Sequence, residues 1–394
     1  MNGAGINMFD ERRSIIIRDG KKLSFDYVPE KLVHREEQMS TLRMLFRPVF
    51  DDGRSETAFV TGTVGTGKTA TVKRFCADMM RYGAEKGIPV EHVIVNCRQR
   101  NTENAVVLQI LRHFDPGHPD RGFSVPEMLR TLRGLMEARR SRLVIVLDEA
   151  DILFKKNAVD IIYQLSRFNE ETTGPAISVS MILISQEYIL DGLDAASLST
   201  FKRTNTIRFD KYRRNELRDI VGIRAEEALF QGRIREDAID LIADISSEWG
   251  DARFAIDLLD KSARKGENKE NGEVTAEEVR EAKAMIYSVV TETKLSDLDR
   301  NHKIVLLAIA RSIKDKAYVT TGASEKTYAV VCEEYGETAR KHTQFWTYVK
   351  DIEKTGIITT SVKGDADGGR TTYISLPDIP SRVLAQKLES MIEP

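Results

Sequence analysis

The octapeptide Gly62-Thr63-Val64-Gly65-Thr66-Gly67-Lys68-Thr69 decides the fold of the first half of the chain. It follows the short apolar run of residues 58–61 and leads into a helix-like stretch that begins at Ala70. Strand, glycine-rich loop and helix in this order are the context of a phosphate-binding loop. Glycines let the backbone N–H groups turn inward around phosphate oxygens, and the positive end of the following helix dipole points at the same atoms. The sequence therefore predicts a site for a nucleoside triphosphate.

Two loop side chains and an acidic pair predict that this site uses magnesium. Lys68 can reach the β- and γ-phosphates, and the Thr69 hydroxyl can complete a Mg²⁺ shell. Asp148 and Glu149 close the most apolar run of the chain, residues 143–147. We assign Asp148 to the metal and Glu149 to the attacking water, because carboxylates at a strand end beside a phosphate loop have these roles. An acidic helix N-terminus is the alternative.

Composition bounds the class of protein. A chain of 394 residues is too long for one core, so two or three domains are expected. Hydrophobic content of 41% and charged content of 30% are typical of a soluble globular protein, and the net charge of −2 gives no global basic field. The three cysteines have neither metal-site nor disulfide spacing, and the apolar runs are too short to span a bilayer. We expect a cytoplasmic protein, associated with the nucleoid and without a membrane partner.

The pattern along the chain predicts an arm and three domains. Residues 1–22 are expected to be a mobile arm. Over residues 23–210, apolar strands alternate with helices, which predicts an α/β domain with a parallel sheet covered on both faces. Residues 211–294 read as helices alone and form the expected lid domain, and residues 295–394 form the last domain.

The last domain has the pattern of a winged helix-turn-helix. Helices are expected over residues 302–313, 325–335 and 340–354, followed by two strands joined by a loop at 364–369. Three helices and a hairpin are a DNA-reading form. The polar face of the third helix and the hairpin supply the expected DNA contacts, which are Arg340, Thr343, Gln344, Thr347, Lys350, Lys363, Arg370 and Thr371. A plain solvated face is the alternative for any one of them.

Two further side chains are candidates for contact with the phosphates. Gln186 follows the apolar run of residues 177–184, where its amide could bind the γ-phosphate or the attacking water. A capping or solvent-exposed glutamine fits the same position. Arg253 opens a lid helix and could reach back across the cleft to the phosphates, so that the lid senses ATP. An ordinary surface arginine is the alternative there.

In the order of these motifs the chain resembles archaeal origin-recognition initiators of the AAA+ ATPase class, which are related to eukaryotic origin-recognition subunits and to the helicase-loading factor. The resemblance covers residues 27–376, nearly the whole chain. The matching segments are the adenine-side entry (27–29 and 32–38), Walker A (62–69), the second strand (93–98), Walker B (147–151), sensor 2 (250–253) and the wing (368–371).

The resemblance implies a fold, cofactors and partners. The fold is an AAA+ α/β core with an all-α lid and a C-terminal winged helix. The cofactors are ATP or ADP with Mg²⁺, held by Val28, His34, Arg35, residues 62–70, Tyr212 and Arg253. The partner is double-stranded origin DNA, contacted by the winged helix and by an AAA+ insertion. We map that insertion to the turn-rich stretch before Val125, with Arg121 and Gly122 as the expected contact.

The chain departs from the family pattern at two places. Gln186 stands where the family has its sensor-1 asparagine. The family's arginine finger follows Leu-Asp-Pro, whereas Leu193-Asp194 is followed here by Ala195-Ala196-Ser197, with Lys202 and Arg203 out of register. A finger can contribute ~10³–10⁵ in rate to a neighbour's hydrolysis. Its loss suggests a protein that does not activate a neighbour, such as an auxiliary paralogue.

The leading hypothesis is an ATP-regulated replication initiator that binds origin DNA, hydrolyses ATP slowly as a switch and helps to load the replicative helicase. A paralogous initiator on the same origin is a further expected partner. The alternative is a nucleotide-stabilised auxiliary paralogue that regulates DNA without productive ATPase cycling. A third hypothesis, a clamp-loader-like or chaperone-like ring ATPase, requires a working finger, and Ala195-Ala196 counts against it.

Overall fold

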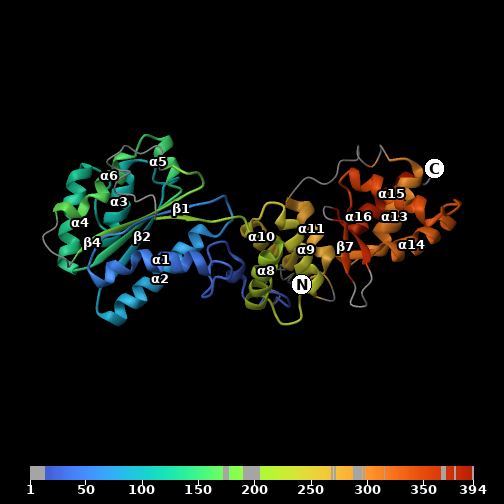
Figure 1. Cartoon of the computed structure of the whole chain (residues 1–394), viewed down its shortest axis with the longest axis horizontal. Helices are drawn as coiled ribbons and strands as arrows, with labels where there is room; N and C mark the ends of the chain where they lie inside the picture. Colours follow the sequence, from blue (N-terminus) through green and yellow to red (C-terminus); the bar gives the residue numbers. More distant parts are fainter. Residues whose placement is uncertain are drawn as a thin grey trace, which may run out of the picture. The chain divides into compact units, whose positions relative to one another are not determined.

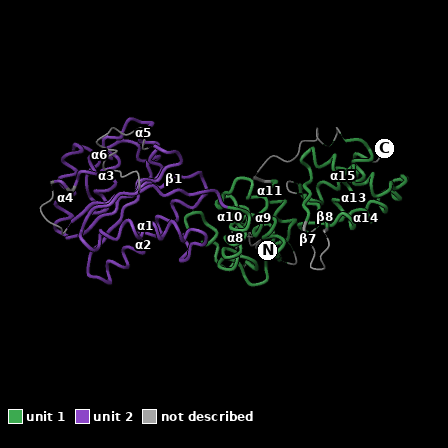
Figure 2. The backbone as a smooth tube through the Cα atoms, in the orientation of Figure 1, with its two compact units in different colours: residues 1–27, 213–394 green, residues 28–212 purple. Residues whose placement is uncertain are grey.

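The computed structural model describes residues 14–171, 177–189, 205–267, 269, 272–286, 295, 298–314, 316–364, 370–376 and 379–392. The chain forms two compact units, one of Val28–Tyr212 and one of Met1–Tyr27 with Arg213–Pro394 (Figure 2). It therefore passes between the units twice, after Tyr27 and after Tyr212. Among the residues that the structure describes, no helix has the length and apolar character needed to cross a membrane.

The unit of residues 28–212 is built on a five-stranded parallel sheet (Figure 1). Its strands, in the order β2-β3-β4-β1-β5, are β2 Val90–Asn96, β3 Arg142–Asp148, β4 Ser178–Ser185, β1 Thr57–Thr61 and β5 Thr206–Arg208. Its helices are α1 Glu36–Asp51, α2 Lys68–Lys86, α3 Glu103–Phe114, α4 Val125–Arg139, α5 Asp151–Lys155 and α6 Asp160–Ser166, with the 3₁₀ turn η2 Phe168–Glu171. The prediction of a parallel-sheet α/β core is confirmed.

The central strand β3 shows why this sheet needs helices on both faces. Leu143, Ile145 and Leu147 pack in one core cluster with residues of α3, α4 and α6. Val144 and Val146 point to the other face and pack with residues of α1 and α2. Because successive residues of a strand alternate between faces, a strand that is apolar throughout must be covered on both sides.

The lid is made of α8 Arg214–Ala228, α9 Glu236–Ser247, α10 Ala252–Gly266 and α11 Ala276–Ile286, with the 3₁₀ turn η1 Gly20–Leu23. Residues 14–22 differ from the mobile arm that the sequence predicted. Ile16 is completely buried, and the Glu267 carboxylate accepts hydrogen bonds of 3.0 Å from the N–H groups of Ile15, Ile16 and Ile17. One apolar anchor and three consecutive N–H donors thus hold residues 14–22 against the lid.

The C-terminal part is a winged helix, as predicted. It contains α13 Arg300–Ile313, β6 Tyr318–Thr320, α14 Thr321–Glu334, α15 His342–Lys354, β7 Thr359–Gly364, β8 Arg370–Ser375 and α16 Ser381–Ile392. The strands pair antiparallel in the order β6-β8-β7. The sequence analysis did not predict β6 or α16. The buried Leu384, Leu388 and Ile392 of α16 recur every four residues and complete the core of this domain.

Ile16→Ala is expected to destabilise the lid by about 2–4 kcal/mol, because it removes a fully buried branched side chain and leaves a cavity. Urea unfolding followed by tryptophan fluorescence, which reports on the compact unit that contains Trp249 and Trp346, measures the effect. Ile15→Ala is the matched control, since Ile15 is 43% exposed and its truncation should change the unfolding free energy by less than ~1 kcal/mol. Equal losses for the two variants would contradict the packed segment.

Candidate nucleotide site and DNA-binding surface

The loop between β1 and α2 has a shape that requires glycine. Gly62, Gly65 and Gly67 have φ angles of +153°, +75° and +85°. A Cβ atom at Gly62 would lie 2.3 Å from the carbonyl oxygen of Phe209, and one at Gly67 would lie 2.5 Å from the Tyr212 hydroxyl. Neighbouring backbone and side-chain atoms therefore press directly against the loop, and no larger residue fits at these two positions.

Lys68 begins α2 and holds its ammonium group over the loop. Its side chain is buried, and Nζ donates to the carbonyl oxygens of Gly62 at 2.5 Å and Thr63 at 2.7 Å. The Thr66 hydroxyl donates to the same Thr63 oxygen at 2.8 Å. Phosphate oxygens can replace these carbonyl acceptors without leaving the charge unpaired, so the loop fits a nucleotide phosphate.

Thr69 and Asp148 bring two hard oxygen ligands together. The Thr69 hydroxyl donates to Asp148 Oδ2 at 3.0 Å, and the Glu149 N–H donates to Asp148 Oδ1 at 3.0 Å. Burial raises the pKa of Asp148 above its ordinary value, and these two hydrogen bonds oppose the shift. A hydroxyl and a carboxylate beside a phosphate loop fit a Mg²⁺ ion, which takes few protein oxygens and several from phosphate and water.

Glu149 is engaged by an arginine that the sequence analysis did not single out. Arg98 donates from Nε to Glu149 Oε2 at 2.7 Å. Arg98 follows β2 by two residues, and β2 pairs with β3 so that Asn96 lies opposite Asp148. The sequence signal for this contact was an arginine placed just after the strand that neighbours the acidic pair. The carboxylate that we assign to the attacking water is thus held by a cation.

The entry segment before α1 lies against the loop through Arg35. This buried side chain donates from Nε to the Thr66 carbonyl and from Nη2 to the Asp210 carbonyl, both at 3.0 Å. Its guanidinium lies 3.7 Å from the centre of the Tyr212 ring. Arg35 and Tyr212 are therefore brought together at the loop, while Val28 and His34 are partly buried in the same unit.

Gln186 is exposed and comes directly after β4, the strand between β3 and β1. Because carboxyl ends of parallel strands share one sheet edge, it lies at the edge that carries Asp148. Arg253 belongs to the other compact unit, where its N–H donates to the capping Asp251 carboxylate at 2.7 Å. Its contact with phosphate stays a prediction. Residues 193–197, 202 and 203, which bear on the arginine finger, lie outside the described residues.

Helix α15 has the two faces that the sequence predicted. Phe345, Val349 and Ile352 are buried in the domain core. The side chains left exposed at the start of the helix and on its outer face are Arg340, Thr343, Gln344 and Thr347.

Lys350 is engaged within the domain. Its ammonium donates to Glu353 at 2.8 Å and to the Thr360 hydroxyl at 2.9 Å, and it lies 4.9 Å from the centre of the Trp346 ring. These contacts tie α15 to β7. A DNA contact by Lys350 would have to compete with them.

The wing and the AAA+ insertion complete the predicted DNA contacts. Lys363 pairs with Thr371 and Gly364 with Arg370 across β7 and β8. The side chains of Lys363 and Arg370 lie outside the description, and that of Thr371 is partly buried.

In the insertion, Arg121 and Gly122 are exposed. The loop before them is held by Arg112, whose guanidinium donates to the His118 carbonyl at 2.8 Å and pairs with Asp120 at 2.7 Å. The exposed pair therefore follows an ordered turn.

Three protein families match segments of the chain. Residues 52–193 match the AAA domain family, residues 218–284 match the Cdc6 AAA+ ATPase-type lid domain, and residues 293–386 match the C-terminal winged helix domain of CDC6. The chain is 30% identical over 393 residues to the ORC1-type DNA replication protein 2 of Sulfurisphaera tokodaii, an alignment that covers 96% of this chain and 93% of that protein.

Solved structures that resemble nearly the whole chain include the following two. The Cdc6p protein of Pyrobaculum aerophilum is 29% identical, with a TM-score of 0.79 over 96% of this chain and 99% of that one. The ORC1 protein of Aeropyrum pernix, solved in complex with DNA, is 28% identical, with a TM-score of 0.64 over 96% of this chain and 97% of that one.

Gly67→Ala should weaken ADP binding at least ~tenfold, because the new Cβ meets the Tyr212 hydroxyl and the left-handed backbone is strained. Isothermal titration calorimetry measures the affinity. Gly87→Ala at the other end of α2 is the control, since its φ is also positive but nothing lies within 4 Å of the built Cβ. Tyr212→Phe added to Gly67→Ala should recover part of the affinity. Equal affinities for the two alanine variants would refute the role of this close approach.

Proposed function

The chain belongs to the family of ORC1- and Cdc6-type DNA replication proteins, and from this membership we propose that it is an ATP-regulated initiator that recognises double-stranded origin DNA. The observation that carries the proposal is the combination, in one chain, of a glycine cradle beside the Thr69–Asp148 pair with a winged helix. That the Aeropyrum pernix ORC1 protein was solved with DNA supports DNA as the partner here.

In the nucleotide site, each residue has a distinct part. Lys68 exchanges its loop carbonyls for phosphate oxygens, and the N–H groups of the loop bind the remaining oxygens. Thr69 and Asp148 would hold a magnesium ion, which would neutralise charge on the phosphates. Gln186 orients the attacking water, and Arg253 is assigned to the phosphates from the lid.

Slow hydrolysis follows from the contact of Glu149. A carboxylate oxygen that accepts a 2.7 Å hydrogen bond from Arg98 is occupied by the arginine and is not free to accept one from the attacking water. Release of this contact would free Glu149 to activate the water. Hydrolysis then acts as a switch that is turned on by a movement of Arg98 away from Glu149.

DNA is read mainly by α15. Thr343, Gln344 and Thr347 are short polar side chains suited to base edges in the major groove, and Arg340 is suited to phosphate. The wing residues Lys363, Arg370 and Thr371 and the insertion residues Arg121 and Gly122 add backbone or minor-groove contacts. Lys350 supports α15 through Glu353 and Thr360 rather than reading bases.

Two partners follow from family membership. We assign this chain a part in loading the replicative helicase, on an origin shared with a paralogous initiator. The sequence Ala195-Ala196 in place of the finger motif favours a chain that does not stimulate hydrolysis in a neighbour.

An auxiliary regulator without productive ATPase cycling is the second candidate, favoured by the engaged state of Glu149. Glu149→Gln distinguishes the two candidates. If hydrolysis is a switch, the DNA-linked phenotypes of the chain should be lost in this variant. If the nucleotide only stabilises the chain, they should be kept.

The proposal is tested by footprinting the full chain on the host's origin regions at physiological salt, with ATP and with ADP. Protection of origin segments over random duplex is expected, by the 10³-fold or more that is typical of specific recognition (~4 kcal/mol). Equal protection of random duplex would end the proposal of origin recognition.

Arg98→Ala should raise basal ATP hydrolysis several-fold, because it frees the Glu149 carboxylate, and should leave ATP affinity unchanged. A phosphate-release assay measures the rate. Arg100→Ala removes an exposed arginine two residues along and is the control. A rate equal to or below that of the unmodified protein would show that Arg98 does not restrain Glu149.

Gln344→Ala should relax origin specificity by about 1–3 kcal/mol while leaving non-specific affinity unchanged. Arg340→Ala should instead weaken binding to all sequences and reduce the slope of log K against log salt by about 1. Fluorescence anisotropy over a salt series separates the two effects. Gln386→Ala on α16, which lies outside the helix-turn-helix, is the exposed-glutamine control.

A further inference from the structure

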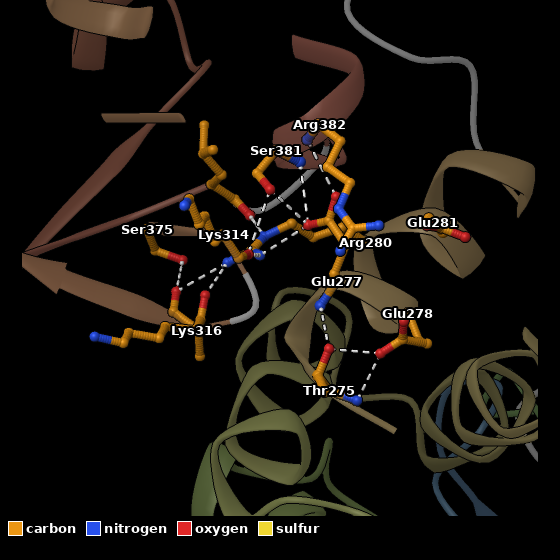
Figure 3. Close-up of polar contacts among 12 residues, drawn as sticks. Thr275, Glu277, Glu278, Arg280, Glu281, Lys314, Lys316, Ser375, Ser381 and Arg382 are labelled. Atoms are coloured by element: carbon orange, nitrogen blue, oxygen red, sulfur yellow. Dashed lines mark hydrogen bonds and ion pairs between the residues drawn. The ribbon is translucent and has the colours of Figure 1, made fainter. Parts of the chain in front are cut away.

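A fully buried arginine of the lid is hydrogen-bonded to the winged helix (Figure 3). Both domains belong to the same compact unit. The side chain of Arg280 on α11 has no solvent exposure. Its guanidinium donates to four backbone carbonyls of the winged helix at 2.6–3.2 Å, those of Lys314, Lys316, Ala317 and Leu376. The fifth N–H goes to Glu277 at 3.3 Å, so all five donors of the guanidinium are used.

Glu277, one helical turn before Arg280, binds the beginning of α16 in the winged helix. Its carboxylate accepts from the N–H groups of Ser381 and Arg382, both at 3.2 Å, and from the Ser381 hydroxyl at 2.9 Å. These are the first N–H groups of α16, where a carboxylate is favoured by the helix dipole. A lid side chain therefore serves as the N-terminal cap of a winged-helix helix.

The position of α11 is itself fixed. Glu278, which is almost completely buried, accepts from the Thr275 N–H at 2.7 Å and from the Thr275 hydroxyl at 2.5 Å (Figure 3). It also pairs with Lys269. This reciprocal cap sets where the helix begins. Residues three apart lie on one helix face, so Glu277 and Arg280 both face the winged helix.

Helix α9 holds the same winged-helix segment from a second helix of the lid. The Asp237 carboxylate accepts from the Ala317 N–H at 3.2 Å, and the Asp244 carboxylate accepts from the Tyr318 hydroxyl. The segment is also strained, because Lys314 has φ +35° and ψ −118°, and its carbonyl is one of those held by Arg280.

We propose that Glu277 and Arg280 lock the lid and the winged helix into one rigid body, so that any nucleotide-dependent movement of the lid carries the DNA-reading helix with it. Turning one domain against the other would strip the Arg280 guanidinium of its four carbonyl acceptors in the winged helix and the Glu277 carboxylate of its donors in α16, which leaves the hydrogen-bonding groups of a buried ion pair unsatisfied. The coupling of lid movement to DNA reading rests on the proposed nucleotide-regulated DNA binding. The rigid body of lid and winged helix rests on the contacts alone.

The test measures a distance across the lid and the winged helix in the full chain. Spin labels are placed on cysteines introduced at the exposed Glu226 in α8 and Val330 in α14. The native cysteines are buried, and burial raises the pKa of Cys76 and Cys97 to about 12, which keeps them unreactive. A single narrow distance distribution, the same with ADP and with a non-hydrolysable ATP analogue, is expected.

Arg280→Met should broaden that distribution and abolish the dependence of DNA affinity on the nucleotide, while ADP affinity stays unchanged. Arg311→Met is the matched control, because Arg311 pairs with Glu334 and Glu389 inside the winged helix only. That variant should keep the narrow distribution. If Arg280→Met does not fold, Tyr318→Phe removes only the hydroxyl bound by Asp244 and should give a smaller broadening.

A broad distribution in the unmodified protein overturns the rigid body. A narrow distribution in Arg280→Met, or in Tyr318→Phe where Arg280→Met does not fold, shows that these contacts do not lock the two domains and overturns the proposal. If the distances behave as expected but the unmodified protein binds DNA equally with ADP and with the ATP analogue, the rigid body stands and the proposed switch fails. The two failures are therefore distinguishable.

Discussion

The parallel register of the five-stranded sheet is the constraint on which the nucleotide site depends. The carboxyl ends of parallel strands meet at one edge, so the loop after β1, Asp148 at the end of β3, Gln186 after β4 and Arg98 after β2 all lie there. Close packing fixes the register of a strand buried on both faces, because a shift by one residue would move every packed side chain to the opposite face. The apolar residues of β3 and β4 thus position polar groups that they do not touch.

Two arginine–glutamate pairs show how burial decides what an ion pair does. In the Arg98–Glu149 pair the side chains are 65% and 26% exposed, so water can replace either partner and the contact can open. In the Arg280–Glu277 pair both side chains are completely buried, and removal of one partner of such a pair costs about 3–5 kcal/mol. The first geometry suits a contact that must be broken during a cycle, and the second suits one that must persist.

Much of the fold could be predicted from the sequence because its signals are local. The strand expected at residues 143–147 is β3, Arg142–Asp148, and the glycine loop follows β1 as its spacing required. Helix α16 was missed although its apolar residues recur every four positions, whereas the other missed features depend on distant partners. Strand β6 has three residues and pairs with β8, and Ile16 is buried at a place where Glu267 holds the backbone around it. The Arg98–Glu149 contact likewise depends on a register between strands that no local pattern shows.

Tyr212 connects the state of the loop to the rest of the chain. Its hydroxyl presses against Gly67, its ring is covered by Arg35, and it is the last residue before the chain enters the lid unit. A change in the loop that moves Gly67 therefore alters the space that Tyr212 occupies. Because α8 begins two residues later, at Arg214, only Arg213 separates Tyr212 from the first helix of the lid. A lid that shares one rigid body with the winged helix needs no further relay to pass such a movement to DNA.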